Sequence, residues 1–129
     1  MLEPIDAATE RVAAAIVDAA YHVHRALGPG LLESVYETCL AHELSKRGID
    51  VQRQVVLPIV YDGVTLESGL RLDMVVGGCV VVELKAVEVL LPVHKAQVLA
   101  YLRLSGHRLG ILLNFNVALI KEGIRRIVF

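Results

Sequence analysis

Residues 70–85 read LRLDMVVGGCVVVELK, and this stretch predicts the centre of a β-sheet. Two runs rich in Val and Leu flank Gly77-Gly78, an arrangement that is typical of a β-hairpin. The three consecutive valines at 80–82 indicate that the second strand is covered on both faces. Asp73 and Glu83 each lie five residues from the second glycine, so a hairpin would place them on adjacent strands.

On either side of this hairpin, the hydrophobic pattern changes between helical and strand periods. Helices are predicted where apolar residues recur every three to four positions, and strands where Val, Ile and Leu cluster between turn residues. In chain order, the predicted elements are helices at about 6–27 and 32–47, strands at 51–61, 66–76 and 79–85, a helix at 92–105, a strand at 109–114, and a last strand or short hairpin arm within 118–128. This α-α-β-β-β-α-β-β order predicts an α/β fold with a mixed central β-sheet flanked by helices.

The composition indicates one ordinary folded domain over residues 1–129. Hydrophobic residues make up 55% of the chain and charged residues 21%, which excludes a disordered chain. The net charge of −1 excludes a general electrostatic attraction to nucleic acid, so such contacts would need local Lys and Arg clusters or bound metal ions. The apolar content is high for a chain of this size, which is consistent with either a monomer or a homodimer.

The chain carries no pattern of a membrane or secreted protein. No apolar run reaches the about 20 residues that a membrane span needs. The N-terminal residues lack the basic and apolar segments of a signal peptide. Cys39 and Cys79 are far apart and have no zinc-ligand spacing, as expected of reduced thiols. We therefore expect a cytoplasmic protein with no membrane association.

The predicted strand that ends at Lys85 combines an apolar run with charged residues at its end. Side chains alternate along a strand, so Glu83 and Lys85 project to the same face. They form either an ion pair or solvated rim at the strand end, or part of a site. Two carboxylates as close as Asp73 and Glu83 would repel each other unless they shared a cation. Mg²⁺ prefers oxygen ligands, and the backbone carbonyl of Leu84 is a further candidate ligand.

A third carboxylate is expected from the predicted helix at 32–47. Glu33 and Tyr36 are three residues apart and share one helical face, and Glu37, four residues after Glu33, is an alternative on that side. Glu33 also lies near the helix N-terminus, where a negative charge would favour the helix dipole without any other role.

Polar residues also recur along the predicted helix at 92–105. His94, Gln97 and Tyr101 follow at i, i+3 and i+7 and therefore share a face. Such a stripe is either a solvated surface or a support for the site. The residue types differ from the Lys and Glu of an ordinary exposed stripe.

These motifs together resemble a known family. The stretch Gly30-x-x-Glu33-x-x-Tyr36 resembles the signature of the GxxExxY proteins, which belong to the PD-(D/E)XK nuclease superfamily, in its RecB-like and lambda-exonuclease-like branch. The resemblance extends from about residue 13 to residue 128 and includes Asp73, Glu83-Leu84-Lys85 and Gln97-x-x-x-Tyr101. It implies a restriction-endonuclease-like core. The sequence departs from the family name in one position, because a leucine rather than a proline precedes Asp73.

The resemblance implies a role for each candidate residue. The implied catalytic residues are Asp73, Glu83, Lys85 and Glu33. The implied metal ligands are Asp73, Glu83, Leu84, Glu33 and His24, the last matching a helical histidine of some relatives. The implied substrate-binding or supporting residues are Gln97, Tyr101, Tyr36, His94 and Lys95.

The function implied is metal-dependent hydrolysis of phosphodiester bonds in nucleic acid, DNA rather than RNA. An all-oxygen ligand set favours Mg²⁺, with Mn²⁺ as a substitute. One alternative is a catalytically silent nucleic-acid-binding or protein-interaction module that retains the fold. Another is a metal-free structural domain with ordinary ion pairs. The presence of all four expected charged residues favours the enzyme.

Overall fold

The structure, a computed structural model, describes residues 2–129. Its elements in chain order are α1 (Ala7–Leu27), α2 (Glu33–Lys46), β1 (Val51–Tyr61), β2 (Val64–Val76), β3 (Val80–Lys85), α3 (Pro92–Ser105), β4 (Leu109–Asn114), the 3₁₀ helix η1 (Ile120–Gly123) and β5 (Ile124–Val128). The predicted α/β class and element order are confirmed. The segment at 118–128 differs in detail, since a 3₁₀ turn precedes its strand.

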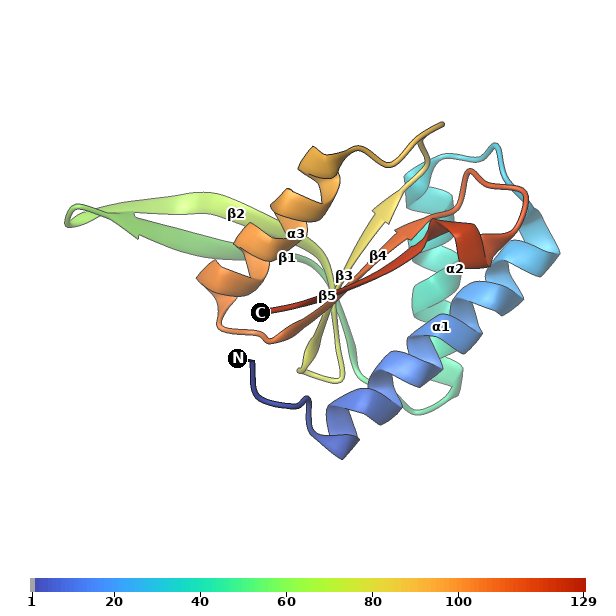
Figure 1. Ribbon diagram of the computed structural model, residues 1–129, viewed down its shortest axis with the longest axis horizontal. Coiled ribbons are helices and arrows are strands. Elements are labelled where there is room, and N and C mark those ends of the chain that lie inside the picture. The colour runs from blue at the N-terminus through green and yellow to red at the C-terminus, as the bar shows by residue number, and fades with distance from the viewer. Residues whose placement is uncertain (1) are drawn as a thin grey trace.

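The five strands form one mixed sheet in the order β1-β2-β3-β4-β5 (Figure 1). Neighbouring strands are antiparallel except β3 and β4, which are parallel. A parallel pair needs a crossover connection, and α3 supplies it between these two strands. The sheet is therefore a meander of three strands, followed by a helical crossover and a final hairpin.

Helices cover both faces of the sheet (Figure 1). On one face, α1 and α2 pack with Val82 of β3 and the buried ring of Phe115. On the other face, Val98 and Leu102 of α3 pack on Val81. Burial of each such side chain contributes roughly 1.5–3 kcal/mol, so β3, covered on both sides as predicted, is the centre of the fold.

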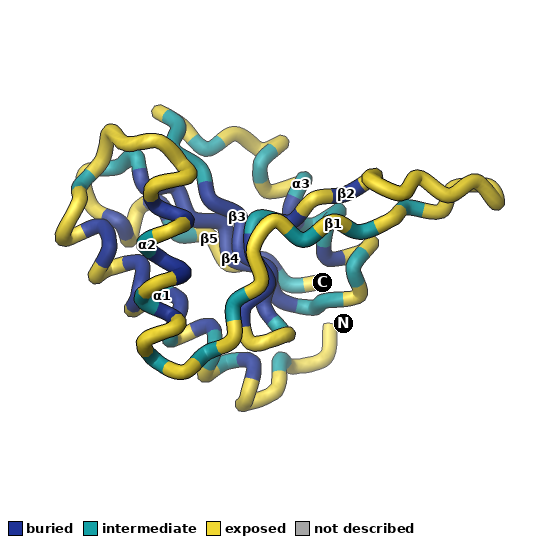
Figure 2. The backbone as a smooth tube through the Cα atoms, turned by 180° about the vertical axis from the view of Figure 1, so that it is seen from behind, coloured by how far each residue is buried: buried dark blue, intermediate teal, exposed yellow. Residues whose placement is uncertain are grey.

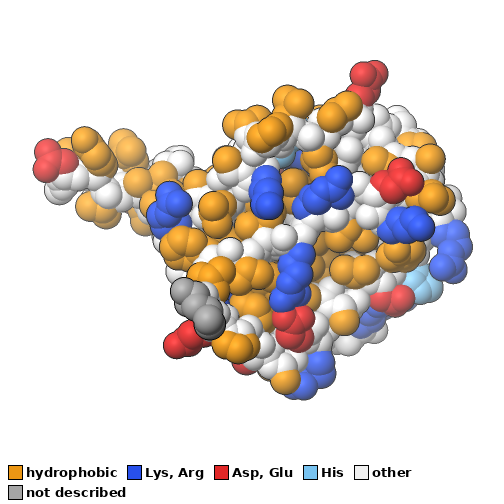
Figure 3. Space-filling model, in the orientation of Figure 1, with side chains coloured by type: hydrophobic (Ala, Val, Ile, Leu, Met, Phe, Trp, Pro, Cys, Tyr) orange, Lys and Arg blue, Asp and Glu red, His pale blue; other side chains and the backbone are white. Residues whose placement is uncertain are grey.

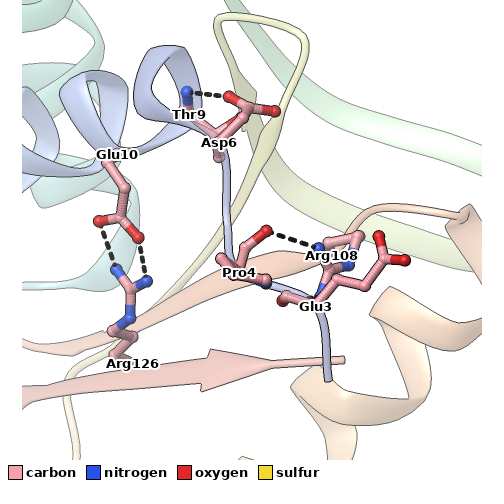
Figure 4. Close-up of polar contacts among 7 residues, drawn as sticks. All are labelled: Glu3, Pro4, Asp6, Thr9, Glu10, Arg108 and Arg126. Carbon is pink, nitrogen blue, oxygen red and sulfur yellow. Dashed lines mark hydrogen bonds and ion pairs between the residues drawn. The ribbon is translucent and has the colours of Figure 1, made fainter. Parts of the chain in front are cut away.

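The helix ends follow from the local sequence. Asp6 caps α1, because its carboxylate accepts a hydrogen bond of 2.7 Å from the Thr9 amide (Figure 4). Pro92 begins α3, where its missing N–H is not needed, and Gly106 ends it in a left-handed conformation at φ 81°. These residues make both ends of α3 coincide with the prediction.

Two arginines tie distant parts of the chain together (Figure 4). Arg126 on β5 pairs with the carboxylate of Glu10 on α1. Arg108 donates hydrogen bonds to the carbonyls of Glu3, at 2.6 Å, and Pro4, at 3.2 Å, and also to that of Phe129. The N-terminal segment and the last strand are therefore fixed beside each other.

Strands β1 and β2 continue beyond the body of the protein as a two-stranded arm (Figures 1 and 2). The arm turns at Asp62-Gly63, whose φ angles of 50° and 76° are those of a tight hairpin turn. Because this turn has only two residues, β2 begins at Val64, earlier than the prediction of residue 66. No helix in residues 2–129 has the length and apolar character that spanning a membrane requires.

Candidate functional site

The candidate site lies where β2 and β3 diverge. Their antiparallel pairing runs from the Gly77-Gly78 turn to Met74 opposite Val82, so the next positions are Asp73 and Glu83. There, side chains take the place of backbone pairing. Glu83 Oε1 accepts a hydrogen bond of 3.0 Å from the Asp73 amide, and Asp73 Oδ2 accepts one of 2.9 Å from the Leu84 amide. The two carboxyl groups are therefore adjacent and fixed by the backbone.

These carboxyl groups have shifted proton affinities. Glu83 is only 4% exposed, and burial, followed by the negative charge of Asp73, raises its pKa to about 8. Burial also raises the pKa of Asp73, and the negative charge of Glu37 adds to the shift. The positive charge of Lys85 opposes the increase in both pKa values. Both shifts favour the protonated form of the pair, whereas a bound cation would favour the ionised form.

Lys85 follows Glu83 by two residues and lies on the same face of β3, half-buried. It is the last residue of the strand, and its carbonyl accepts a 3.0 Å hydrogen bond from the Phe115 amide. The backbone of Lys85 is therefore fixed. Its ammonium group is close enough to Asp73 and Glu83 to lower both of their pKa values.

Glu37, from α2, supplies the third negative charge at the site. It is 8% exposed, although it is a carboxylate on a short helix. Its Oε2 accepts a hydrogen bond of 3.0 Å from Arg53 Nε, and its Oε1 accepts one of 2.6 Å from Gln54 Nε2. Both partners lie on β1, so the network joins α2 to the sheet beside Asp73.

Gln54 has an unusual backbone conformation. Its φ is 51°, a region that residues other than glycine rarely adopt. Since Arg53 pairs with Met74 and Val55 with Leu72, Gln54 lies across from Asp73 on the neighbouring strand. Strain of this kind is often found at functional sites. In this protein, the positive φ of Gln54 turns its side-chain amide toward Glu37.

Glu33, the helical glutamate that the signature indicates, is placed differently. It is the first residue of α2 and is exposed. The charges that shift the pKa values of Asp73 and Glu83 come from each other, from Lys85 and from Glu37. The structure therefore brings Glu37 to the pair, and the signal for it was present in the sequence. Glu37 precedes Leu40, Ala41 and Leu44 by three, four and seven residues, which is the buried face of α2.

Helix α3 adds a tyrosine and a glutamine to the site. Gln97 Nε2 donates a hydrogen bond of 2.7 Å to the Tyr101 hydroxyl. Burial raises the pKa of Tyr101, and the charges of Glu83 and Asp73 add to this. Tyr101 is thus close to the carboxyl pair. His94 has a local role, because its Nδ1 accepts the Leu91 N–H at 3.0 Å at the start of α3.

Lys95, another candidate on α3, lies away from the carboxyl pair. It lines a groove with Leu112 of β4 and Arg125 of β5. Asp73 and Glu83 belong to β2 and β3, and neither of them lines this groove. The structure therefore does not bring Lys95 together with Gln97 and Tyr101.

Tyr36 and His24 fix loops rather than face the pair. The Tyr36 hydroxyl donates to the Gly28 carbonyl at 2.6 Å and accepts the Leu31 N–H at 3.1 Å, and its ring stacks on Phe115. His24 Nε2 lies 2.8 Å from the Val117 carbonyl. Since a carbonyl only accepts, this nitrogen carries the proton and is not free to bind a metal.

The donor set fits a hard divalent cation. Asp73 and Glu83 are adjacent carboxylates whose repulsion a cation would relieve, and all their donor atoms are oxygens. Among residues 2–129, no group of three or more His, Cys, Asp or Glu side chains is arranged to hold a metal together. The two acids are thus the first choice of ligands, in keeping with Mg²⁺, which binds one or two carboxylates and keeps several waters.

Comparison with known proteins agrees with this geometry. A family model described as the PD-(D/E)XK nuclease superfamily matches residues 10–127, nearly the whole chain. No curated protein and no solved structure matches the chain. The matched region contains both strands of the carboxyl pair, the lysine that follows it, and all three helices. The chain therefore belongs to the PD-(D/E)XK nuclease superfamily.

Proposed function

We propose that this protein is a metal-dependent nuclease that hydrolyses phosphodiester bonds in nucleic acid, with DNA as the expected substrate. The observation that carries the proposal is the buried Asp73–Glu83 pair, which is fixed by reciprocal backbone hydrogen bonds and in which burial raises both pKa values. A structural pair would be more stable as a neutral or apolar pair. Membership of the nuclease superfamily supports metal-dependent cleavage as the role of this costly arrangement, and the likeness to the GxxExxY proteins supports the same role.

Asp73 and Glu83 are the residues that would hold Mg²⁺, or Mn²⁺ in its place. When bound, the ion supplies Lewis-acid activation of the attacking water. The reciprocal hydrogen bonds keep one oxygen of each carboxyl group on the backbone. Asp73 Oδ1 and Glu83 Oε2 do not take part in these two bonds, so they would be available to a cation.

Lys85 and Tyr101 would act on the substrate. Lys85 has a fixed backbone and a charge directed at the pair, so it would orient the attacking water or stabilise negative charge developing at phosphorus. The Tyr101 hydroxyl accepts from Gln97, which leaves its own proton free to donate to a phosphate oxygen. Both groups lie on the face of the sheet that α3 covers.

Glu37 takes the part that the signature assigns to Glu33. Held by Arg53 and Gln54, it keeps a negative charge next to Asp73 without moving. That charge would strengthen cation binding at the pair. It also joins α2 to the edge of the site, so the position of Asp73 depends on contacts from β1.

Metal-dependent cleavage tests the proposal. Labelled single- and double-stranded DNA and RNA are incubated with the wild type, Asp73→Asn and Asp50→Asn, in Mg²⁺, Mn²⁺ or EDTA. Asp50 is exposed and serves as the matched control. Cleavage that requires metal, persists in the control and is lost in Asp73→Asn supports the nuclease. Equal cleavage by Asp73→Asn contradicts it.

One observation favours a second candidate, a silent module that binds nucleic acid. The hydrogen bonds to Asp73 and Glu83 also satisfy the diverging strand ends, which would stabilise the fold without any metal. This candidate predicts retention of DNA in a binding assay, no cleavage, and no Mn²⁺ binding by calorimetry. Calorimetry and cleavage together therefore separate the two candidates.

A further inference from the structure

The arm formed by residues 56–69 of β1 and β2 exposes large apolar side chains. Their exposed fractions range from 46% to 75%. These residues are Val56, Val60, Tyr61, Val64 and Leu66. The arm projects away from the helices, so nothing in its own chain covers it (Figures 1 and 2). A two-stranded ribbon has no core of its own and is marginal in water, which indicates that the arm packs on another surface.

The charge of the arm restricts what that surface is. Residues 56–69 contain two acids, Asp62 and Glu67, and no Lys or Arg, and the nearest basic residue is the exposed Arg71 across from Val56 at the base of the arm. In Figure 3 the arm carries apolar side chains along its length and an acidic group at its tip, and a basic side chain stands where it joins the body. Phosphates and anionic membranes would be repelled by this surface. Its partner is therefore an apolar protein surface with positive charge.

The arm meets this partner through side chains rather than through strand pairing. Pro58 on the edge strand β1 lacks an N–H, and the β1–β2 register shifts between Leu57 and Ile59. A proline and a bulge on an edge both oppose the addition of another strand. Beside the bulge, Gly69 leaves room for Ile59, whose atoms would lie 2.8 Å from an added Cβ.

A groove of about 320 Å³ between α3 and β5 has the complementary character. Its apolar lining comes from Leu90, Leu91, Pro92 and Leu112. Its charged lining comes from Lys95 and Arg125, and among residues 2–129 no ion pair engages either of them. Figure 3 views this side of the molecule, where basic side chains stand among apolar ones.

Another apolar groove of this molecule lacks that complementarity. The groove along α1 is larger, about 450 Å³, but its charged residues are two acids, Glu10 and Asp18, and one arginine. That arginine, Arg126, is already paired with Glu10, and Asp18 is paired with Arg47. Its charge is therefore satisfied within the chain. Of these two grooves, the α3–β5 groove suits an acidic apolar arm better, because its charged residues are basic.

We propose that the arm of one copy docks in the α3–β5 groove of a second copy, and that the exchange is reciprocal. Twofold symmetry makes each contact twice and closes the assembly. Six residues in each strand of the arm extend for about 20 Å, at about 3.3 Å per residue. Because the exchange is reciprocal, the dimer buries the surface of two arm–groove contacts rather than one. The groove and the carboxyl pair share no lining residue, although Leu112 of the groove is the β4 partner of Glu83.

Sedimentation equilibrium of the full chain tests this contact. Wild type is measured up to about 100 µM, with Tyr61→Ser and Glu67→Arg in the arm, Arg125→Glu in the groove, and Arg11→Glu as an exposed control. All changed side chains are exposed, so circular dichroism should show unaltered folding. We expect a wild-type dimer whose dissociation constant increases at least about fivefold in each arm or groove variant, and not in the control.

The double variant Glu67→Arg with Arg125→Glu identifies the pairing of surfaces. We expect it to dimerise more tightly than either single variant, because the exchanged charges attract again. Asp73→Asn should dimerise like the wild type. A monomeric wild type at the highest concentration, or a dimer that the arm and groove variants leave unchanged, would overturn the proposal.

Discussion

The carboxyl pair and the arm each lie in surroundings that do not match their own polarity. At the diverging ends of β2 and β3, charged groups are buried, with Glu83 only 4% exposed. In the arm, apolar groups face water, with Tyr61 75% exposed. A single strand, β2, passes through both regions. Both arrangements cost stability in the isolated chain, a cost that a bound cation would offset at the pair and a second surface would offset at the arm.

We expect the largest effect from removing the positive charge of Lys85, which lowers the pKa of both acids. Lys85→Ala should lower cleavage by about 10²–10³-fold, because negative charge developing at phosphorus loses a fixed positive partner. Single-turnover cleavage with saturating Mg²⁺ measures it, and Lys121→Ala, an exposed lysine on η1, is the control. Cleavage equal to that of the wild type would remove Lys85 from the mechanism.

The buried pair should also make stability depend on pH in an unusual direction. The folded-state pKa of Glu83, about 8, is above its ordinary value of 4.5, so the folded protein binds the proton more tightly than the unfolded chain. In EDTA, stability is then fully present below about pH 4.5 and is lost as the pH rises toward 8. We expect Tm to fall by several degrees over this range.

Two controls test that assignment. Glu83→Gln should flatten the decrease in Tm, since the group that titrates is gone. Mg²⁺ should reverse the decrease in the wild type, because the cation replaces the proton. A wild-type Tm that rises steadily from pH 5 to 8 in EDTA would show that the pair is ionised.

Substitution of Glu37 or Glu33, two glutamates of α2, should have a smaller effect on the protein than the changes above. Glu37→Gln weakens contacts with Arg53 and Gln54 and should lower the free energy of unfolding by about 1–2 kcal/mol, since Arg53 is partly solvated. It should also weaken Mn²⁺ binding. Glu33→Gln, at an exposed position, should change stability by less than about 0.5 kcal/mol. Urea unfolding and calorimetry measure both, and the reverse order would return the role to Glu33.

The smallest effect should come from the arm. In dilute solution, Tyr61→Ser should change the free energy of unfolding by less than about 0.5 kcal/mol, because the ring is already exposed. Urea unfolding well below the dimer dissociation constant is the measurement. A marked loss of stability there would mean that the arm packs within its own chain.

Much of the fold could be predicted from local signals. Equal spacing of Asp73 and Glu83 from the Gly77-Gly78 turn predicted adjacent acids, because an antiparallel hairpin fixes which residues face each other. Pro92 and Gly106 determine the two ends of α3, because proline lacks an N–H and glycine readily adopts the left-handed conformation that ends a helix. In these cases, the information lay within a few residues of the feature.

Other parts of the site depend on contacts that local patterns do not contain. The signature directed attention to Glu33, whereas the phase of the buried face of α2 turns Glu37 inward. Arg53 and Gln54 hold Glu37 from β1, 16 and 17 residues away, and the positive φ of Gln54 has no sequence signal. Nor could spacing show that the Nε2 of His24 is bonded to Val117, 93 residues later in the chain.

The pairing of Arg126 with Glu10 spans 116 positions and has a consequence for folding order. Helix α1 packs mainly on α2, which follows it directly, and also on η1, which lies far along the sequence beyond β4. The β1–β2–β3 meander can form from near neighbours, while β4 must wait for α3. We expect the α1–α2 pair to form early, and the contacts of α1 with η1 and Arg126 to form late, because they join positions far apart in the sequence.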